Sequence, residues 1–227
     1  MKSYLLVGSS SAVARNLTQK LHEEGFGLYS ISRSAMPDFP GNHHTLDVLK
    51  DELPVIEEPL DGLVYFPGTI HLKPFRSLKM EDIEHDFQVN VAGAIKCLQH
   101  YLPALKKSEK AAVVMFSTVA VQQGMPFHAS VAISKGAIEG LVRSLAAEFA
   151  PAIRFNCIAP SLTDTPLAER LLNTPEKQAS AAQRHPMKSI GKSDDLAHMV
   201  HFLLSEKSGW MTGQILHVDG GMSSLKV

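Results

Sequence analysis

The sequence predicts an α/β fold, a doubly wound parallel sheet of about seven strands with helices on both faces. Short apolar runs alternate with longer segments of helical period along the chain, which is the order expected of parallel strands joined by helices. The runs are continuously apolar, as is typical of strands covered on both faces. With 227 residues and no repeat or linker, the chain is expected to form one domain, 1–227.

The first half of the chain begins with a strand, a Gly–Ser turn and an amphipathic helix, and its apolar runs are short and bounded by turn residues. The strands predicted here are Lys2–Val7, Phe26–Ile31 and Gly62–Phe66. The helices predicted here are Ala12–Glu24, a proline-interrupted helix within Val48–Leu60, and Lys79–Lys106, the longest.

The second half repeats the alternation and adds a polar, proline-rich segment before its last helix. The strands predicted here are Ala111–Phe116, Ile153–Ile158 and Gln214–Val218. The helices predicted here are Ala129–Phe149, Leu167–Arg184 and Asp194–Leu204, the last one capped by Ser193. We expect residues 162–192 to close over a substrate as a lid, because the segment is rich in small and polar residues and follows a strand.

Composition excludes several classes of protein. The 22 basic and 23 acidic residues are nearly balanced, which argues against nucleic acid or an acidic membrane as partner. Cys97 and Cys157 lie in apolar periodic segments outside any C-x-x-C pair, so they are predicted to be buried, reduced thiols of a cytoplasmic protein. No H-x-x-x-H or H-E-x-x-H spacing occurs, so no metal site is expected. No apolar run is long enough for a signal peptide or a membrane span.

The strand–loop–helix from Ala111 to Phe149 carries a lysine in an unusual place. Lys135 lies four residues after Val131, so both side chains point to the same side of the helix as its apolar stripe. A lysine on a buried helical face is costly unless it has a partner. This stretch resembles the catalytic segment of the short-chain dehydrogenase/reductase family, which has a Ser at the strand end and, thirteen residues later, the Tyr of a Y-x-x-x-K pair. Lys135 matches the lysine, Thr118 stands at the serine position, and Val131 stands where the family has its tyrosine.

The resemblance implies a Rossmann-like domain whose first turn holds the pyrophosphate of a dinucleotide at a helix N-terminus. Here that turn has Gly8, followed by Ser10, Ser11 and Val13, while alanine replaces the family's second and third glycines. On its own, a single glycine favours a strand–turn–helix without a cofactor. An added methyl group at the two alanines would weaken or shift pyrophosphate binding.

Arg33 follows the second strand, and no acidic residue lies beside it. An arginine there pairs with the 2′-phosphate of NADP, whereas NAD needs a carboxylate, so NADP (NADPH) is favoured over NAD. The alternative is a solvated surface arginine. The resemblance extends over the full chain, including the C-terminal W-M-T-G-Q-I-L-H-V-D-G-G. The further positions that it assigns to cofactor binding are Asp47, Val48, Gly68, Lys135, Pro160 and Thr165.

In the family, the tyrosine exchanges a proton with the substrate, the lysine lowers its pKa, the serine orients the carbonyl and an asparagine holds a water relay. The resemblance places three of these catalytic roles here, at Asn90, Thr118 and Lys135. His128 is the catalytic candidate for the missing acid, because it lies three residues before Val131 and imidazole titrates near neutrality. Tyr65 is a second candidate. Alternatively, His128 is a polar surface or capping residue.

Two hypotheses follow from the sequence. The first is an NADP(H)-dependent oxidoreductase that acts on a small-molecule carbonyl or alcohol with an altered proton donor. The second is a non-catalytic relative that binds a nucleotide or metabolite for regulation or assembly. The resemblance also implies a homodimer or homotetramer, paired through the helices within Lys79–Lys106 and Ala129–Phe149. The substrate itself is not readable from the residues.

Overall fold

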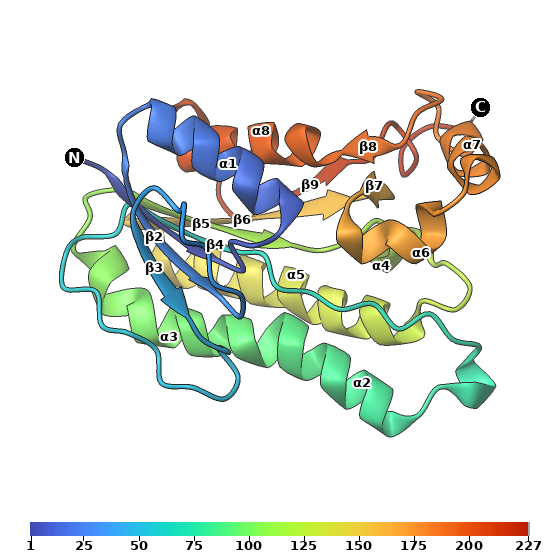
Figure 1. Ribbon diagram of the computed structural model, residues 1–227, viewed down its shortest axis with the longest axis horizontal. Coiled ribbons are helices and arrows are strands. Elements are labelled where there is room, and N and C mark those ends of the chain that lie inside the picture. Colours follow the sequence, from blue (N-terminus) through green and yellow to red (C-terminus); the bar gives the residue numbers. More distant parts are fainter. Residues whose placement is uncertain (227) are drawn as a thin grey trace.

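Seven parallel strands form one sheet in the computed structural model, which describes residues 1–226 (Figure 1). Their order is β3-β2-β1-β4-β5-β6-β9, so the strand order reverses between β1 and β4. This confirms the predicted doubly wound sheet. The strands are β1 Ser3–Val7, β2 Gly27–Ser32, β3 Asn42–Thr45, β4 Gly62–Tyr65, β5 Ala111–Phe116, β6 Ile153–Pro160 and β9 Ile215–Val218.

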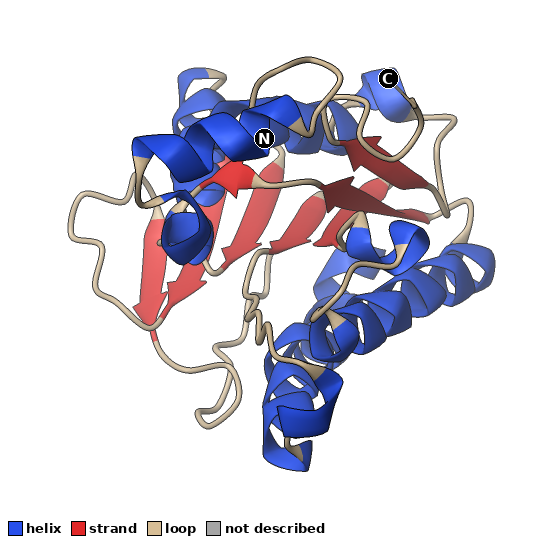
Figure 2. Cartoon of the chain, turned by 90° about the vertical axis from the view of Figure 1, so that its right-hand side faces the viewer, coloured by secondary structure: helices blue, strands red, loops and turns tan. Residues whose placement is uncertain are grey.

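Helices cover both faces of the sheet. Helices α1 and α8 pack together on one face, and α2, α3 and α5 lie on the other (Figures 1 and 2). The helices of four or more residues in regular α form are α1 Ala12–Glu23, α2 Met80–Phe87, α3 Gly93–Lys106, α4 Ala120–Gln123, α5 Ala129–Phe149, α6 Glu169–Leu172, α7 Pro175–Gln183 and α8 Ser193–Leu204. No helix within residues 1–226 is long and apolar enough to cross a membrane.

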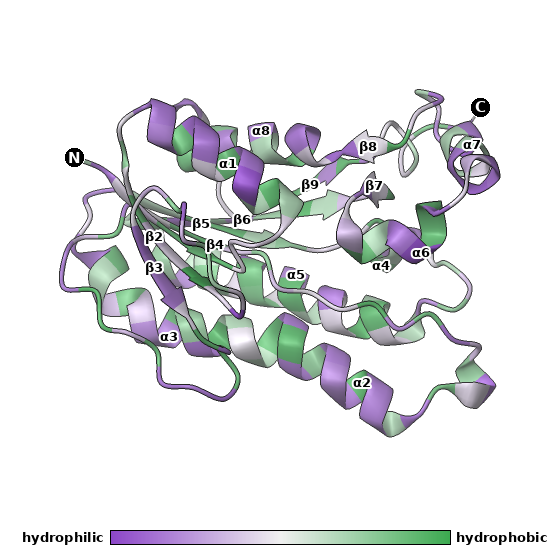
Figure 3. Cartoon of the chain, in the orientation of Figure 1, coloured by the Kyte–Doolittle hydropathy of each residue, from purple (hydrophilic) through white to green (hydrophobic). Residues whose placement is uncertain are grey.

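Strand β1 shows how the sequence builds a core on each side. Leu5 and Val7 join the cluster under α3 and α5, while Tyr4 and Leu6 join the cluster under α1 and α8. Because side chains alternate across a strand, a continuously apolar strand supplies both cores at once. Figure 3 shows that α5, which packs against the sheet, is largely apolar, whereas α7 is mostly polar. Both cysteines are buried and free, and burial raises the pKa of each thiol to about 12.

Two segments differ from the sequence analysis, which predicts no strand between Ile31 and Gly62. Residues Asn42–Thr45 form β3, an edge strand paired to β2, although the sequence N-H-H-T contains no apolar run. The proposed helix within Val48–Leu60 is absent, and the segment is irregular chain that buries Leu53, Ile56 and Leu60. Pro54 and Pro59 explain this, because proline supplies no backbone N–H and clashes with a preceding helical turn.

The long helix predicted from Lys79 to Lys106 is interrupted. A π-helical turn, Gln88–Ala92, separates α2 from α3 and shifts the buried face by one residue. Phe87 lies four residues after Ile83 and four before Val91 in the apolar spacing of the sequence, yet it is 39% exposed, whereas Asp86 and Asn90 are buried. The side-chain amide of Asn90 donates to the Asp86 carbonyl, which in a regular α-helix accepts the backbone N–H of Asn90. The side chain therefore stabilises the turn that holds it.

The segment 162–192 is a closed excursion from the sheet rather than one helix. Its ends are joined by the two-residue strands β7, Thr163–Asp164, and β8, Gly191–Lys192. Between them a 3₁₀ turn, Pro166–Ala168, leads into α6, and Thr174 caps α7, which starts at Pro175. The two helices close on a small core of their own, made of Ala168, Leu172 and Ala181.

Candidate functional site

A cleft of about 930 Å³ lies where the turns after the parallel strands meet. It is bounded by the turns after β1, β2, β4, β5 and β6, by the start of α5 and by the segment 162–192. The sequence-predicted site residues that line it are Gly8, Ser10, Ser11, Val13, Arg33, Asp47, Val48, Gly68, Thr118, His128, Lys135, Pro160 and Thr165. Asn90 is the predicted residue that does not line the cleft.

The turn after β1 requires its glycine. Gly8 has φ +81°, and a Cβ there would lie 2.8 Å from the Cδ of Pro67, so another residue would be strained and crowded. Ser11 caps α1, with its hydroxyl accepting the N–H of Ala14. Ala12 lines the cleft and Ala14 is fully buried. The N-terminus of α1 therefore opens into the cleft, which suits an anionic group.

The polar residues after β2 and β3 lie at the same end of the cleft. Arg33 is exposed at the end of β2 and takes part in none of the ion pairs formed within residues 1–226. Asp47 follows β3, and its Oδ1 accepts the backbone N–H of Leu49. An exposed guanidinium beside a helix N-terminus makes this end of the cleft suitable for phosphate groups.

The side chains of Lys135 and Asn90 both approach Gly68. A Cβ at Gly68 would lie 3.2 Å from Asn90 Oδ1 and 3.6 Å from Lys135 Nζ, so a larger residue there would press on both groups. Lys135 is 8% exposed, and burial lowers the pKa of its ammonium to about 8. Asn90 is 1% exposed, and its Oδ1 has no hydrogen-bond partner within residues 1–226. Both are polar groups positioned to accept a further partner.

The position of the family's tyrosine lies on the cleft wall. Val131 is 3% exposed, lines the cleft and lies one helical turn before Lys135 on α5. Thr118 follows β5 on the neighbouring wall, and its Oγ1 accepts the N–H of Ala120 at 3.3 Å. Ser117, which also lines the cleft, instead donates its hydroxyl to Glu139 Oε1 at 2.7 Å. A hydroxyl and an ammonium therefore flank an apolar position.

The two candidates for the missing acid have different surroundings. His128 is half-buried at the start of α5 and lines the cleft, with Nδ1 2.7 Å from the carbonyl oxygen of Pro126. Tyr65 donates its hydroxyl to the Val89 carbonyl at 2.7 Å, and burial raises the pKa of its phenol well above the ordinary value. The Tyr65 hydroxyl therefore donates its proton to the π-helical turn. The contact of His128 with Pro126 uses Nδ1 and leaves Nε2 for another partner.

Sequence reasoning missed the chain from Thr69 to Lys73, which also forms part of the wall. Ile70 and Leu72 line the cleft, and they alternate with the polar residues Thr69, His71 and Lys73. The alternation T-I-H-L-K was the available signal, because it is the period-two pattern of an extended segment with one apolar face. Within residues 1–226, no group of three or more His, Cys, Asp or Glu side chains gathers to hold a metal ion.

Comparison with known proteins supports the resemblance. Residues 43–223 match the family model described as enoyl-(acyl carrier protein) reductase. The chain is 33% identical to the 3-oxoacyl-[acyl-carrier-protein] reductase FabG of Thermotoga maritima, with 97% of each chain covered. Among solved structures, the ligand-free aldohexose dehydrogenase of Thermoplasma acidophilum superposes with a TM-score of 0.88 at 24% identity, covering 100% of this chain and 96% of the other. ElxO with NADP bound superposes with a TM-score of 0.87 at 22% identity, covering 99% of both chains.

The family model spans most of the chain, and the FabG relative is aligned over nearly its whole length. The seven-stranded parallel sheet and the cleft at its carboxyl edge agree with these matches. The chain therefore belongs to the short-chain dehydrogenase/reductase family of oxidoreductases.

Proposed function

We propose that this protein is an NADP(H)-dependent oxidoreductase that interconverts a carbonyl compound and its alcohol, with His128 in place of the family's tyrosine as proton donor. The observation that carries the proposal is the single cleft into which Gly8, Arg33, Thr118, His128 and Lys135 all open. A nucleotide end and a proton-transfer end thus share one cavity. Residues of these types at one sheet edge are what a hydride-transfer site needs.

The residues present suit NADPH. The Gly8 turn and the N-terminus of α1 would take the pyrophosphate, and Arg33 would pair with the 2′-phosphate. The buried Lys135 ammonium would bind ribose hydroxyls, which would compensate for part of its desolvation. When bound, NADPH supplies the hydride. ElxO, which shares this fold, has been solved with NADP bound, in agreement with such a cofactor here.

His128 suits the role of proton donor better than Tyr65. The Pro126 carbonyl can only accept, so the contact at 2.7 Å places a proton on His128 Nδ1 and leaves Nε2 to exchange a proton with the substrate. In the reduction, the carbonyl oxygen would take a proton from Nε2 of the imidazolium form of His128. The imidazole is then neutral and regains its proton from solvent. Thr118 would orient the carbonyl oxygen through its hydroxyl.

The preference for NADPH is tested at Arg33. Arg33→Ala should weaken NADPH binding by about 1.5–3 kcal/mol, roughly a 10- to 150-fold rise in Kd, because a charged hydrogen bond to the 2′-phosphate is lost. NADH, which has no such phosphate, should bind almost as before. Calorimetry of both variants with both cofactors measures this, and Arg76→Ala, at another exposed arginine outside the cleft, is the control. Equal affinities for NADPH and NADH that Arg33→Ala does not change would contradict the preference.

The second candidate function is a non-catalytic relative that binds a nucleotide or metabolite for regulation or assembly. It is favoured by Val131 at the tyrosine position and by alanines at the second and third glycines of the first turn. The buried Lys135 and the His128 ring, both of which line the cleft near Val131, favour the catalytic proposal. A protein that only binds a nucleotide has no need of a proton donor at that position.

We also propose that the protein is a homodimer or homotetramer. Phe87 on α2 and Ile133 on α5 are 39% and 52% exposed, so helices from the family's pairing face carry apolar side chains at the surface. Light scattering at micromolar concentration should therefore give at least twice the monomer mass of 24.8 kDa. A monomer mass under those conditions would refute the assembly and leave the catalytic proposal standing.

A further inference from the structure

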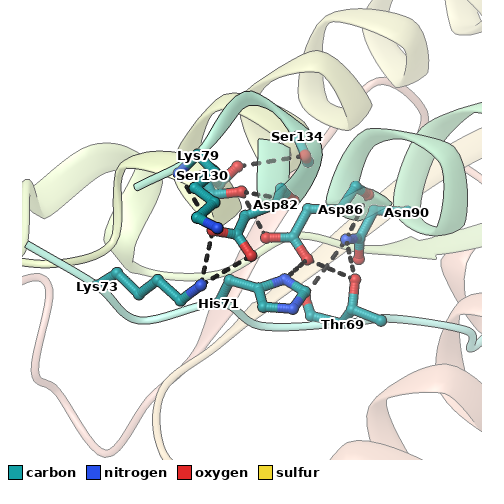
Figure 4. A network of polar contacts seen from close by, with 9 residues as sticks. All are labelled: Thr69, His71, Lys73, Lys79, Asp82, Asp86, Asn90, Ser130 and Ser134. Atoms are coloured by element: carbon teal, nitrogen blue, oxygen red, sulfur yellow. Dashed lines mark hydrogen bonds and ion pairs between the residues drawn. The ribbon is translucent and has the colours of Figure 1, made fainter. Parts of the chain in front are cut away.

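The wall segment, residues Thr69–Lys73, divides its side chains between two surroundings. Thr69, His71 and Lys73 bond to carboxylates on α2, while Ile70 and Leu72 between them line the cleft, together with part of Thr69. Figure 4 shows the polar half of this arrangement, with the three side chains directed toward Asp82 and Asp86. An extended chain that is bonded on one face presents its other face in a fixed orientation.

The bonds to α2 are short and repeat with the helix. Asp82 and Asp86 are four residues apart and so lie on one helical face. Asp86 Oδ1 is 2.7 Å from both Thr69 Oγ1 and His71 Nδ1, and Lys73 Nζ lies 2.7 and 2.9 Å from the two oxygens of Asp82. The wall segment is therefore attached to the helix at every second residue.

Asp86 is the centre of this attachment. It is fully buried, and Ser130 of α5 donates to its Oδ2 at 2.6 Å. Burial alone raises the pKa of this carboxyl, but the hydrogen bonds from Ser130, Thr69 and His71 outweigh it and hold the pKa below the ordinary value. The carboxylate therefore stays charged near neutral pH and fixes the wall segment against both α2 and α5.

The backbone also ties the wall segment to the two sides of the cleft. The N–H of Lys73 donates to the Phe127 carbonyl at 3.2 Å, next to His128. The carbonyl of Thr69 accepts the Asn90 amide at 3.3 Å, behind Gly68. These two bonds hold Ile70 and Leu72 between His128, the proposed proton donor, and the side chain of Asn90.

The opposite wall is apolar as well. Leu167 and Leu171, from the segment 162–192, line the cleft and remain 56% and 39% exposed, and Ile70 is 38% exposed. Large aliphatic side chains left open on both sides of one cleft indicate a ligand that covers them. Among the residues that line the cleft, Asp47 is the single acid, and it lies at the nucleotide end after β3. The polar side chains that line the rest of the cleft, Arg184 and His85 among them, are neutral or basic, so no carboxylate is present beside the aliphatic side chains to hold a cation.

We propose that Ile70 and Leu72 of the wall segment, with Leu167 and Leu171 opposite, bind an aliphatic chain of the substrate. The substrate class is then an aliphatic carbonyl compound, with its carbonyl beside Thr118 and His128 and its chain along the wall segment. This inference rests on the proposed function for the identity of the reacting group. Binding of the aliphatic chain depends on the side chains of the cleft wall, and it can be measured without turnover.

The test is a ligand-observed NMR titration of 2-alkanones of increasing chain length against protein saturated with NADP⁺, where no hydride is available. Each added methylene should tighten Kd by about threefold to fourfold over several carbons, because burial of a methylene stabilises by about 0.8 kcal/mol. Ile70→Thr and Leu72→Thr should flatten this dependence. Val55→Thr is the matched control, a β-branched aliphatic that is 73% exposed and outside the cleft.

A Kd independent of chain length, or an unchanged dependence in the Ile70→Thr/Leu72→Thr double variant, would overturn the inference while leaving cofactor binding and turnover untouched. If NADP⁺ does not bind, the same 2-alkanone titration on the protein without cofactor tests the aliphatic site. A chain-length dependence that the two substitutions remove would then support the aliphatic site although the proposed function had failed.

Discussion

Val131→Tyr should raise the turnover of simple ketones with NADPH by about 10²–10⁴-fold, the range expected for a positioned proton donor. Position 131 lines the cleft one helical turn before Lys135, and Thr118 lies on the adjoining wall. A nearby ammonium stabilises the phenolate that forms as the proton leaves. Because burial lowers the pKa of Lys135 to about 8, the gain should decline as the pH rises through that value and the ammonium is lost.

Val131→Phe is the matched control, since it adds the same ring to the buried site without the hydroxyl. Steady-state assays of both variants, together with NADPH affinity and thermal stability, separate proton donation from changes in packing. A similar gain in Val131→Phe would assign the effect to shape. No gain in a folded Val131→Tyr that still binds NADPH would mean that the cleft is not arranged for the family's chemistry.

His128→Ala should lower wild-type turnover of the true substrate by about 10²–10⁴-fold, because it removes the proposed acid. The dependence of turnover on pH should also change, because the proposed general acid is removed. His198→Ala is the control, at an exposed histidine of α8 that does not line the cleft. Tyr65→Phe should leave turnover nearly unchanged and cost about 1 kcal/mol of stability, because it removes the hydrogen bond to the Val89 carbonyl. Turnover that survives both His128→Ala and Tyr65→Phe would contradict this account of proton transfer.

Elements with a strong internal pattern were predictable. The buried run Ala111–Phe116 and the helical stripe of Ala129–Phe149 have the bounds that the sequence indicates. β3 was not predictable, because an edge strand half open to water carries no apolar run and depends on its pairing with β2. The π-helical turn at Gln88–Ala92 was hidden for a related reason. The apolar spacing of the sequence continues across this turn. The hydrogen bond from the Asn90 side chain to the Asp86 carbonyl cannot be predicted from the spacing of apolar residues.

The cleft was easier to foresee than its wall. Gly8, Arg33 and Thr118 follow strands and Pro160 ends one, and the carboxyl ends of parallel strands meet at one edge. The wall segment depends instead on the match between Thr69–Lys73 and two carboxylates on α2, a pairing between side chains that are 9 and 17 residues apart in the chain. Neither partner is unusual by itself, so only the folded chain shows that they fix Ile70 and Leu72 in the cleft.

The most direct test of the central claim, hydride transfer in this cleft, uses NADPH deuterated at C4 with a panel of aliphatic ketones and mass analysis of the products. The account predicts deuterium on the alcohol carbon for wild-type protein, more of it for Val131→Tyr, and its loss for Lys135→Met. A protein that binds NADPH yet places deuterium in no product, with or without a tyrosine at position 131, would contradict the account and support the binding-only function.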